Sequence, residues 1–283
     1  MNDDASNSDF GDNFVLTMIT NCPTEARRGV LAGINRIGVD LEKIGKAQRQ
    51  SGLNSRVSSH DLNDLEDIRR AIDHHPLFVR VNSMHAGSEF EINAALDIGA
   101  THIMLPYFHR PQEVKDFSRL VNGRATTILL VETAAAIFYI EDLVKISGID
   151  EIHIGLTDLK ISLNIPSRFE TLTHWIAEHV SKVVNGAGLP FHVGGVTCID
   201  DQRLPIPGWR VASQYPRLNA TGALVTRAFL EAANSDSKLI TEVDTFRRFL
   251  NECASSSAKS WEQERSSLKT FIRQELAQGK VLP

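Results

Sequence analysis

The sequence predicts an α/β fold in which eight parallel strands, separated by helices, close into a (β/α)8 TIM barrel with additional C-terminal helices. Two observations carry this prediction: eight short apolar runs rich in Val, Ile and Leu recur along the chain, and segments with helix signals separate them. Apolar runs without strict alternation are typical of parallel strands covered on both faces. Repeated strand and helix favour right-handed crossovers, and eight repeats are the number that closes a barrel.

The predicted strands span the chain from residue 14 to residue 226. They are FVLTMIT (14–20), IGVDL (37–41), LFVRV (77–81), THIML (101–105), TTILLVE (126–132), IDEIHIG (149–155), PFHVGG (190–195) and GALVT (222–226). A doubly wound open sheet is the alternative arrangement of the same elements.

Helix signals fill the segments between these strands. Thr24 is a candidate N-cap for a helix through Arg36, and Asp61 is one for a helix through Ala71, where apolar residues recur at helical spacing. Four further helices are predicted over residues 88–98, 111–121, 134–146 and 169–184.

The pattern changes after the eighth strand. Residues 228–233 and 241–254 have helical patterns, SSSAKS (255–260) has the composition of a hinge, and residues 261–279 form a further amphipathic helix. We therefore predict a barrel domain over residues 14–254, followed by a hinge and C-terminal helix over residues 255–283.

Composition restricts the class of protein. The chain has 283 residues, 42% of them hydrophobic and 23% charged, which is enough apolar material for a large core. A net charge of -5 gives no general attraction for nucleic acid or an anionic membrane surface. Three widely separated cysteines suit a reducing compartment, and the polar, acidic N-terminus is unlike a signal peptide. These features predict a cytoplasmic protein.

Two carboxylates fall at the carboxyl ends of neighbouring predicted strands, where TIM barrels carry their chemistry. Glu132 ends the most apolar strand, and Asp158 follows the next one. Two adjacent carboxylates repel one another unless a cation lies between them, so the pair is a candidate metal site. The alternative is that Glu132 forms an ion pair with an arginine such as Arg80.

Four motifs resemble one known family. VRVN (79–82), GATHIMLP (99–106), LLVETAAA (129–136) and GIDEIHIGLTDLKISL (148–163) occur in the order and spacing of the HpcH/HpaI aldolase and citrate lyase β-subunit family. The resemblance covers roughly residues 14 to 227. VDLEKIGKAQRQ (39–50) and SSHDLNDLEDI (58–68) make the chain most similar to a branch associated with polysaccharide loci.

The resemblance implies a set of site residues. Glu132 and Asp158 would hold Mg²⁺ or Mn²⁺, an assignment that hard carboxylate ligands fit. Arg80 would bind the carboxylate or enolate oxygen of a 2-oxo acid through its planar fork. Backbone N–H groups of Gly155, Leu156 and Thr157 would hold the other end of that carboxylate. The metal would stabilise the enolate, which permits cleavage or formation of the adjacent carbon–carbon bond.

The chain also departs from the family pattern. Aldolase members carry a Glu-His pair after the second strand, whereas this chain has Glu42 followed by Lys43, which excludes catalysis by that histidine. Citrate lyase β-like members instead have an acidic pair, a lysine and an arginine. Asp40, Glu42, Lys46 and Arg49 loosely reproduce that order, so an acyl-CoA substrate stays open.

The acid or base must then come from another side chain. Glu42, Lys46 and His60 are our candidates beside Arg80, and His60 is the first choice among the histidines because it lies in a loop before a helix cap. The alternative for His60 is that it only caps or solvates that loop. The other histidines that we weigh are His85, His153 and His192.

Two classes of function follow. The first is a metal-dependent carbon–carbon lyase or aldolase acting on pyruvate, oxaloacetate or an acyl thioester. The second is a degenerate barrel that binds a 2-oxo acid or a partner protein without turnover, as the missing histidine favours. A phosphoenolpyruvate-utilising barrel would need a further basic phosphate clamp that the sequence does not show.

The C-terminal helix predicts a homo-oligomer. Family members exchange terminal helices between subunits, and the serine-rich hinge would let the apolar stripe of residues 261–279 reach a neighbouring barrel. The alternative is that this helix folds back on its own barrel.

Overall fold

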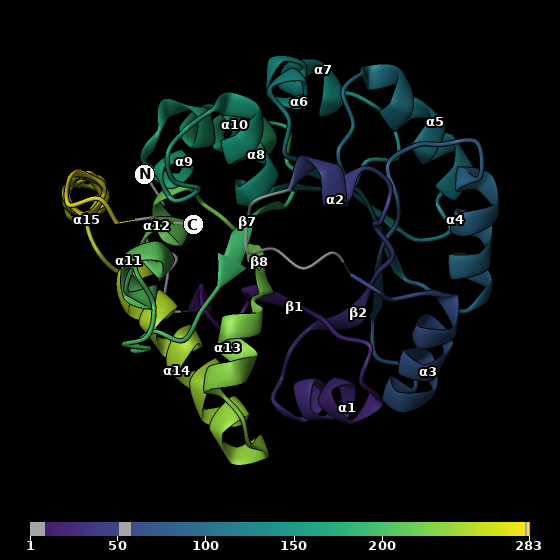
Figure 1. Cartoon of the computed structure of the whole chain (residues 1–283), viewed down its shortest axis with the longest axis horizontal. Helices are drawn as coiled ribbons and strands as arrows, with labels where there is room; N and C mark the ends of the chain where they lie inside the picture. The colour runs from purple at the N-terminus through teal and green to yellow at the C-terminus, as the bar shows by residue number, and fades with distance from the viewer. Residues whose placement is uncertain (1–8, 51–57, 281, 283) are drawn as a thin grey trace, which may run out of the picture.

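The computed structural model describes residues 9–50, 58–280 and 282, and its eight parallel strands close into a barrel in chain order (Figure 1). Each strand pairs with the next one, and β8 pairs with β1, which completes the ring. The strands are β1 (Val15–Ile19), β2 (Arg36–Asp40), β3 (Leu77–Arg80), β4 (His102–Leu105), β5 (Thr126–Val131), β6 (Glu151–Ile154), β7 (Phe191–Val196) and β8 (Gly222–Val225). The predicted TIM barrel is confirmed, and the open sheet was the wrong alternative.

The helices form an outer layer around the strands (Figure 1). They are α1 (Pro23–Leu31), α2 (Lys46–Arg49), α3 (Leu62–Ile72), α4 (Ser88–Asp97), α5 (Pro111–Val121), α6 (Ala134–Phe138), α7 (Ile140–Leu143), α8 (Leu156–Leu163), α9 (Glu170–Thr173), α10 (Trp175–Gly186), α11 (Gly208–Ala212), α12 (Gln214–Arg217), α13 (Arg227–Ala232), α14 (Asp236–Ala254) and α15 (Ala258–Ala277). Among the described residues no helix combines the length and the apolar character that a membrane crossing requires.

The alternation of side chains along each strand divides the core in two. Residues that point outward pack under the helices in one large apolar cluster, as Val79 and Leu129 do. Residues that point inward form a second, smaller cluster of Phe78, Met104, Ile128 and Leu130. These four side chains fill the centre of the barrel. The polar residues of the predicted site lie beyond them, at the carboxyl ends of the strands.

Several predicted helices have different limits in the structure. The helix expected over residues 24–36 ends at Leu31, because Gly33 turns the chain with a φ of 78° and Arg36 already begins β2. The segment 134–146 divides into α6 and α7, and the segment 169–184 divides into α9 and α10. The N-cap predicted at Asp61 is present, since its side chain accepts the backbone N–H groups of Asn63 and Asp64, and the Asp64 side chain accepts the N–H of Asp61 in return, which completes a capping box.

Residues 156–163 correct one expectation directly. No helix was predicted directly after β6, but Gly155 is the N-cap of α8, and Leu156 and Thr157 lie in its first turn. This helix has only eight residues, so its apolar pattern covers too few turns for periodicity alone to reveal it. Of the three backbone N–H groups expected to face an anion, those of Leu156 and Thr157 belong to a helix N-terminus, but that of Gly155 donates to the Val131 carbonyl at 3.1 Å.

The C-terminal segment packs against the side of its own barrel in this single chain. Helices α14 and α15 are separated only by residues 255–257. Helix α15 therefore begins at Ala258, inside the segment 255–260 that was predicted to be a hinge. Leu268 and Ile272 of α15 are buried, and the helix lies against α9, α11 and α12. Of the predicted segment 255–283, residues 281 and 283 lie outside the described residues.

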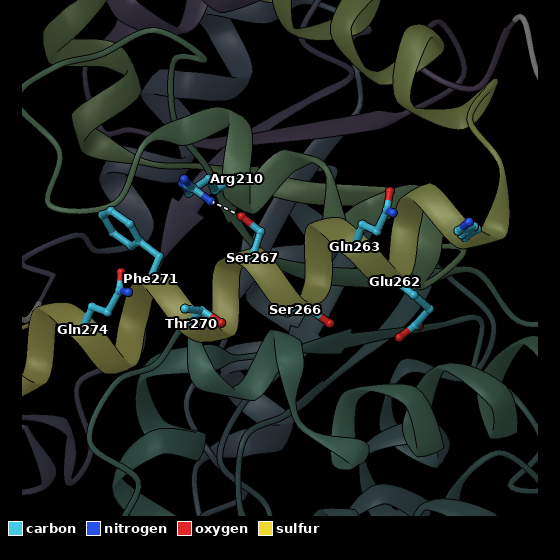
Figure 2. Close-up of a pocket in the computed structure, with 9 residues that line it drawn as sticks. Arg210, Glu262, Gln263, Ser266, Ser267, Thr270, Phe271 and Gln274 are labelled. Carbon is cyan, nitrogen blue, oxygen red and sulfur yellow. Dashed lines mark hydrogen bonds between the residues drawn. The ribbon is translucent and has the colours of Figure 1, made fainter.

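A surface groove of about 620 Å³ runs along α15 (Figure 2). Arg210 of α11 spans it, with its guanidinium carbon 4.4 Å from the ring centre of Trp209 and a hydrogen bond of 2.6 Å from Nη1 to Ser267. None of the predicted site residues lines this groove, so it is separate from the carboxyl ends of the strands.

Candidate active site

The predicted site residues come together where the strands end. Asp40 and Arg80 are paired neighbours at the ends of β2 and β3, Glu132 directly follows β5, and Asp158 lies in the first turn of α8 after β6. Parallel strands in a closed barrel bring all these ends to one face. The geometry therefore follows from where each residue stands in its strand.

Arg80 pairs with Asp40 rather than with Glu132. Its Nε donates to Oδ1 of Asp40 at 2.8 Å and its Nη2 donates to Oδ2 at 2.6 Å, a bidentate arrangement that leaves Nη1 for another ligand. Desolvation opposes the charge of Asp40, but the Arg80 guanidinium outweighs it and holds the pKa of this carboxyl below its usual range. Arg80 also lies 3.6 Å from Glu42. The arginine partner that we weighed for Glu132 is thus engaged elsewhere.

The segment after β2 places two more cationic side chains, Lys46 and Arg49, next to these carboxylates. Gly45 adopts a φ of 71°, which turns the chain into α2. Lys46 Nζ lies 3.0 Å from Asp40 and 2.8 Å from Glu42, and Arg49 Nη2 donates to Glu42 at 2.6 Å. Glu42 is 1% exposed, so its charge is balanced by direct contacts with these cations rather than by water.

Among the buried carboxylates of this cluster, Glu132 has the negative charge that is least balanced by direct contacts. It is 4% exposed, and its hydrogen bond within the described residues comes from the backbone N–H of Tyr107 at 3.0 Å. Burial raises the pKa of Glu132 well above its ordinary value, and the neighbouring charges of Glu42 and Asp158 raise it further. A buried carboxylate in this position is stabilised by a proton or by a cation.

Gly155 is required where it stands beside Glu132. A Cβ atom on this residue would lie 2.6 Å from Oε2 of Glu132 and 2.9 Å from its Cβ. The glycine therefore lets the chain pass close to the carboxylate as it enters α8.

Asp158 faces the same space from α8 and is 5% exposed. Its Oδ2 accepts a hydrogen bond of 2.7 Å from Nε2 of Gln50, and its Oδ1 lies 3.4 Å from Nε of Arg49. The guanidinium of Arg49 in turn stacks on the ring of Tyr107, 3.5 Å from its centre. Sequence reasoning missed Gln50 and Tyr107, since neither has a charge that would single it out.

The donor set fits a hard divalent cation. Glu132 and Asp158 offer carboxylate oxygens, and the electrostatic repulsion that raises the pKa of Glu132 is what a cation would relieve. Among the described residues no cluster of three or more His, Cys, Asp or Glu side chains has a metal-binding arrangement. A metal here would therefore take two protein carboxylates and complete its shell with water and substrate oxygens.

The predicted acid–base residues are already engaged. His60 Nδ1 accepts the backbone N–H of Asp40 at 3.2 Å, which in the neutral ring leaves the proton on Nε2, and burial lowers the pKa of this histidine. Lys46 is ion-paired with Asp40 and Glu42. In this arrangement His60 presents a hydrogen-bond donor at Nε2, and Lys46 presents a fixed positive charge.

The other histidines that we weighed lie elsewhere. His85 is 3.3 Å from Glu91 of α4, and His153 donates or accepts at the Gly194 carbonyl at 3.0 Å from inside the barrel. His192 is buried next to His153, with ring centres 6.0 Å apart. None of these three contacts Glu132 or Asp158 in the described part of the chain.

The fold and this cluster define an eight-stranded α/β barrel with a buried, carboxylate-rich site at the carboxyl ends of its strands. The family model for HpcH/HpaI aldolase/citrate lyase matches residues 54–187. This match confirms the resemblance that the four motifs indicate. None of the curated protein sequences matches the chain.

Solved structures share the barrel at low sequence identity. An HpcH/HpaI aldolase/citrate lyase family protein from Burkholderia cenocepacia J2315 has a TM-score of 0.61 and 18% identity over 84% of this chain and 98% of its own. The citrate synthase SbnG has a TM-score of 0.59 and 18% identity over 83% and 95%. The citrate lyase β subunit from M. tuberculosis, complexed with oxaloacetate and magnesium, has a TM-score of 0.57 and 14% identity over 88% and 100%.

Proposed function

We propose that this protein is a divalent-metal-dependent carbon–carbon lyase or aldolase that acts through the enolate of a small 2-oxo acid such as pyruvate or oxaloacetate. The observation that carries the proposal is Glu132, a buried carboxylate next to Asp158 with no arginine or lysine bonded to it among the described residues. Mg²⁺ or Mn²⁺ at this pair would act as a Lewis acid on the developing enolate. The neighbour that binds oxaloacetate and magnesium supports this class of substrate and metal.

The chain's own residues would bind and orient the acid. Nη1 of Arg80 is not used by Asp40 and is the donor available to a substrate carboxylate or enolate oxygen. The backbone N–H groups of Leu156 and Thr157 at the start of α8 supply a second anion contact, whereas the N–H of Gly155 is already bonded to the Val131 carbonyl. The neutral ring of His60 would donate a hydrogen bond from Nε2–H to the substrate, with Lys46 and Glu42 holding the surrounding charges in place.

One observation favours a second function. His60 and Lys46 are both held by the β2 strand end and its loop, which leaves no free base in the described cluster. A barrel that binds a 2-oxo acid without turnover is consistent with this arrangement. Cytoplasmic location, homo-oligomerisation and use of an acyl-CoA substrate are further parts of the proposal.

A substrate screen separates the two functions. We expect pyruvate, oxaloacetate or acetyl-CoA, presented with a panel of aldehydes and Mg²⁺ or Mn²⁺, to give a product that disappears with chelator and in Glu132→Gln. Glu141→Gln, an exposed glutamate on α7, removes the same charge away from the site and should keep full activity. Metal-dependent binding of pyruvate with no product from any combination would support the binding protein instead.

A further inference from the structure

Arg49 occupies an unusual place for a surface-loop cation. It comes from α2, yet its side chain is only 11% exposed and reaches into the carboxylate cluster. Its guanidinium donates to Glu42 at 2.6 Å, lies 3.4 Å from Asp158 and stacks on the ring of Tyr107 at 3.5 Å. The charge of Glu132 also acts on it. Arg49 therefore neutralises the same side chains that would receive a metal ion.

The buried cluster is close to electrical balance before any ligand binds. Its four carboxylates belong to Asp40, Glu42, Glu132 and Asp158, and its three cations belong to Lys46, Arg49 and Arg80. When all are ionised, one negative charge is left over. A divalent ion reverses this to one positive charge, which a single carboxylate ligand cancels.

We propose that Arg49 is an internal counter-ion that opposes the binding of a divalent ion alone and makes it dependent on an anionic 2-oxo acid. This inference rests on the proposed metal site at Glu132 and Asp158. Arg49 repels the incoming cation and competes for Asp158, and the acid supplies the negative charge that offsets this repulsion. Because coupling between two ligands is reciprocal, the metal must strengthen binding of the acid by the same factor.

The test measures Mn²⁺ binding to the full chain by calorimetry, with and without pyruvate. In the unmodified protein we expect pyruvate to tighten Mn²⁺ binding by at least about tenfold, within the usual range for coupled sites. Arg49→Met keeps an apolar side chain against Tyr107 but removes the charge. We expect it to bind Mn²⁺ alone at least about fivefold more tightly, with a gain from pyruvate that falls below about threefold.

Two control variants make the result specific to Arg49. Lys43→Met removes one positive charge from the same loop, but Lys43 is exposed, so its Mn²⁺ binding should match that of the unmodified protein. Arg49→Lys retains the charge and should stay within about twofold of the unmodified protein for Mn²⁺ alone. Circular dichroism confirms the fold of each variant, and Arg49→Gln takes the place of Arg49→Met if the latter does not fold.

The outcomes are distinguishable. Unchanged or weaker Mn²⁺ binding in Arg49→Met, while the unmodified protein binds Mn²⁺, would overturn the role of Arg49 and leave the metal site standing. Pyruvate without effect on Mn²⁺ affinity in the unmodified protein would overturn the coupling. Absence of Mn²⁺ binding by every protein, with and without pyruvate, would remove the metal site itself and this inference with it.

Discussion

In the proposed function, Arg80 has two tasks that depend on the same planar group of nitrogens. Its Nε and Nη2 hold the buried Asp40, and only Nη1 is left for a substrate. The family resemblance implied Arg80 as a site residue, but the residue that it pairs with could not be read from spacing. Asp40 ends β2, which adjoins the strand of Arg80, whereas Glu132 follows β5, two strands away from it, and the choice between them depends on side-chain directions in the folded barrel.

Replacing Arg80 with lysine should therefore affect folding as well as binding. An ammonium cannot donate two parallel hydrogen bonds to Asp40, so we expect the free energy of unfolding to fall by about 1–3 kcal/mol and pyruvate affinity to fall by a similar free energy. Denaturant titration and calorimetry measure the two effects. Arg70→Lys on the exposed face of α3 is the control and should change neither. Equal stability and equal pyruvate affinity in Arg80→Lys would refute both roles.

At the level of elements, strands were easier to predict from sequence than helices. Each of the eight apolar runs became a strand, because residues buried on both faces give a continuous signal. Short helices that lie in loops, such as α2 and α8, were missed because their apolar pattern covers too few turns. The site depends on both of them, since α2 carries Arg49 and α8 carries Asp158.

The last helix, α15, makes contacts that bear on the predicted exchange between subunits. In the single chain Leu268 and Ile272 of α15 are buried against the barrel, and Arg265 forms an ion pair of 2.9 Å with Glu178 of α10. These contacts can equally be made by the helix of a second subunit, because only residues 255–257 connect α15 to α14. Exchange of α15 between subunits stays our prediction.

Truncation after Ala254 tests the exchange. If α15 crosses to a neighbour, the truncated protein should stay folded, with its helical circular dichroism signal reduced only by the lost helix, and form a smaller assembly by light scattering. A matched variant with Gln263→Ala, on the polar face of the same helix, should assemble like the full chain. An unchanged assembly mass after truncation would show that α15 covers only its own barrel.

At the scale of the whole molecule, the barrel interior has a polar layer near the amino ends of its strands. Arg36 donates two hydrogen bonds to Glu151 at 2.7 and 2.5 Å, and three histidines surround this pair. Burial lowers the pKa of His153 and of His192 to about 3, and that of His102 to about 4. His153 lies inside a predicted strand, but the grouping of the three side chains required the barrel register to be known.

These histidines should make folding sensitive to mild acid. The unfolded chain takes up protons below an ordinary histidine pKa of about 6.5, whereas the folded chain does not until much lower pH. Their contribution to stability is thus complete above about pH 6.5 and is lost as the pH falls toward their folded values. As the pH falls from about 7.5 to about 5, His153 and His192 should each lower the free energy of unfolding by about 2 kcal/mol. Equal denaturant midpoints and slopes at the two pH values would contradict this.

The central claim is that this barrel stabilises the enolate of a 2-oxo acid at Glu132 and Asp158. The direct measurement is exchange of the pyruvate methyl protons in deuterated water, followed by nuclear magnetic resonance with Mg²⁺ present. We predict that exchange is accelerated by the unmodified protein and falls to the protein-free rate with chelator, in Glu132→Gln and in Asp158→Asn, while Glu141→Gln retains it. Binding of Mg²⁺ and pyruvate by the unmodified protein with no acceleration of exchange would contradict the claim and leave a barrel that only binds the acid.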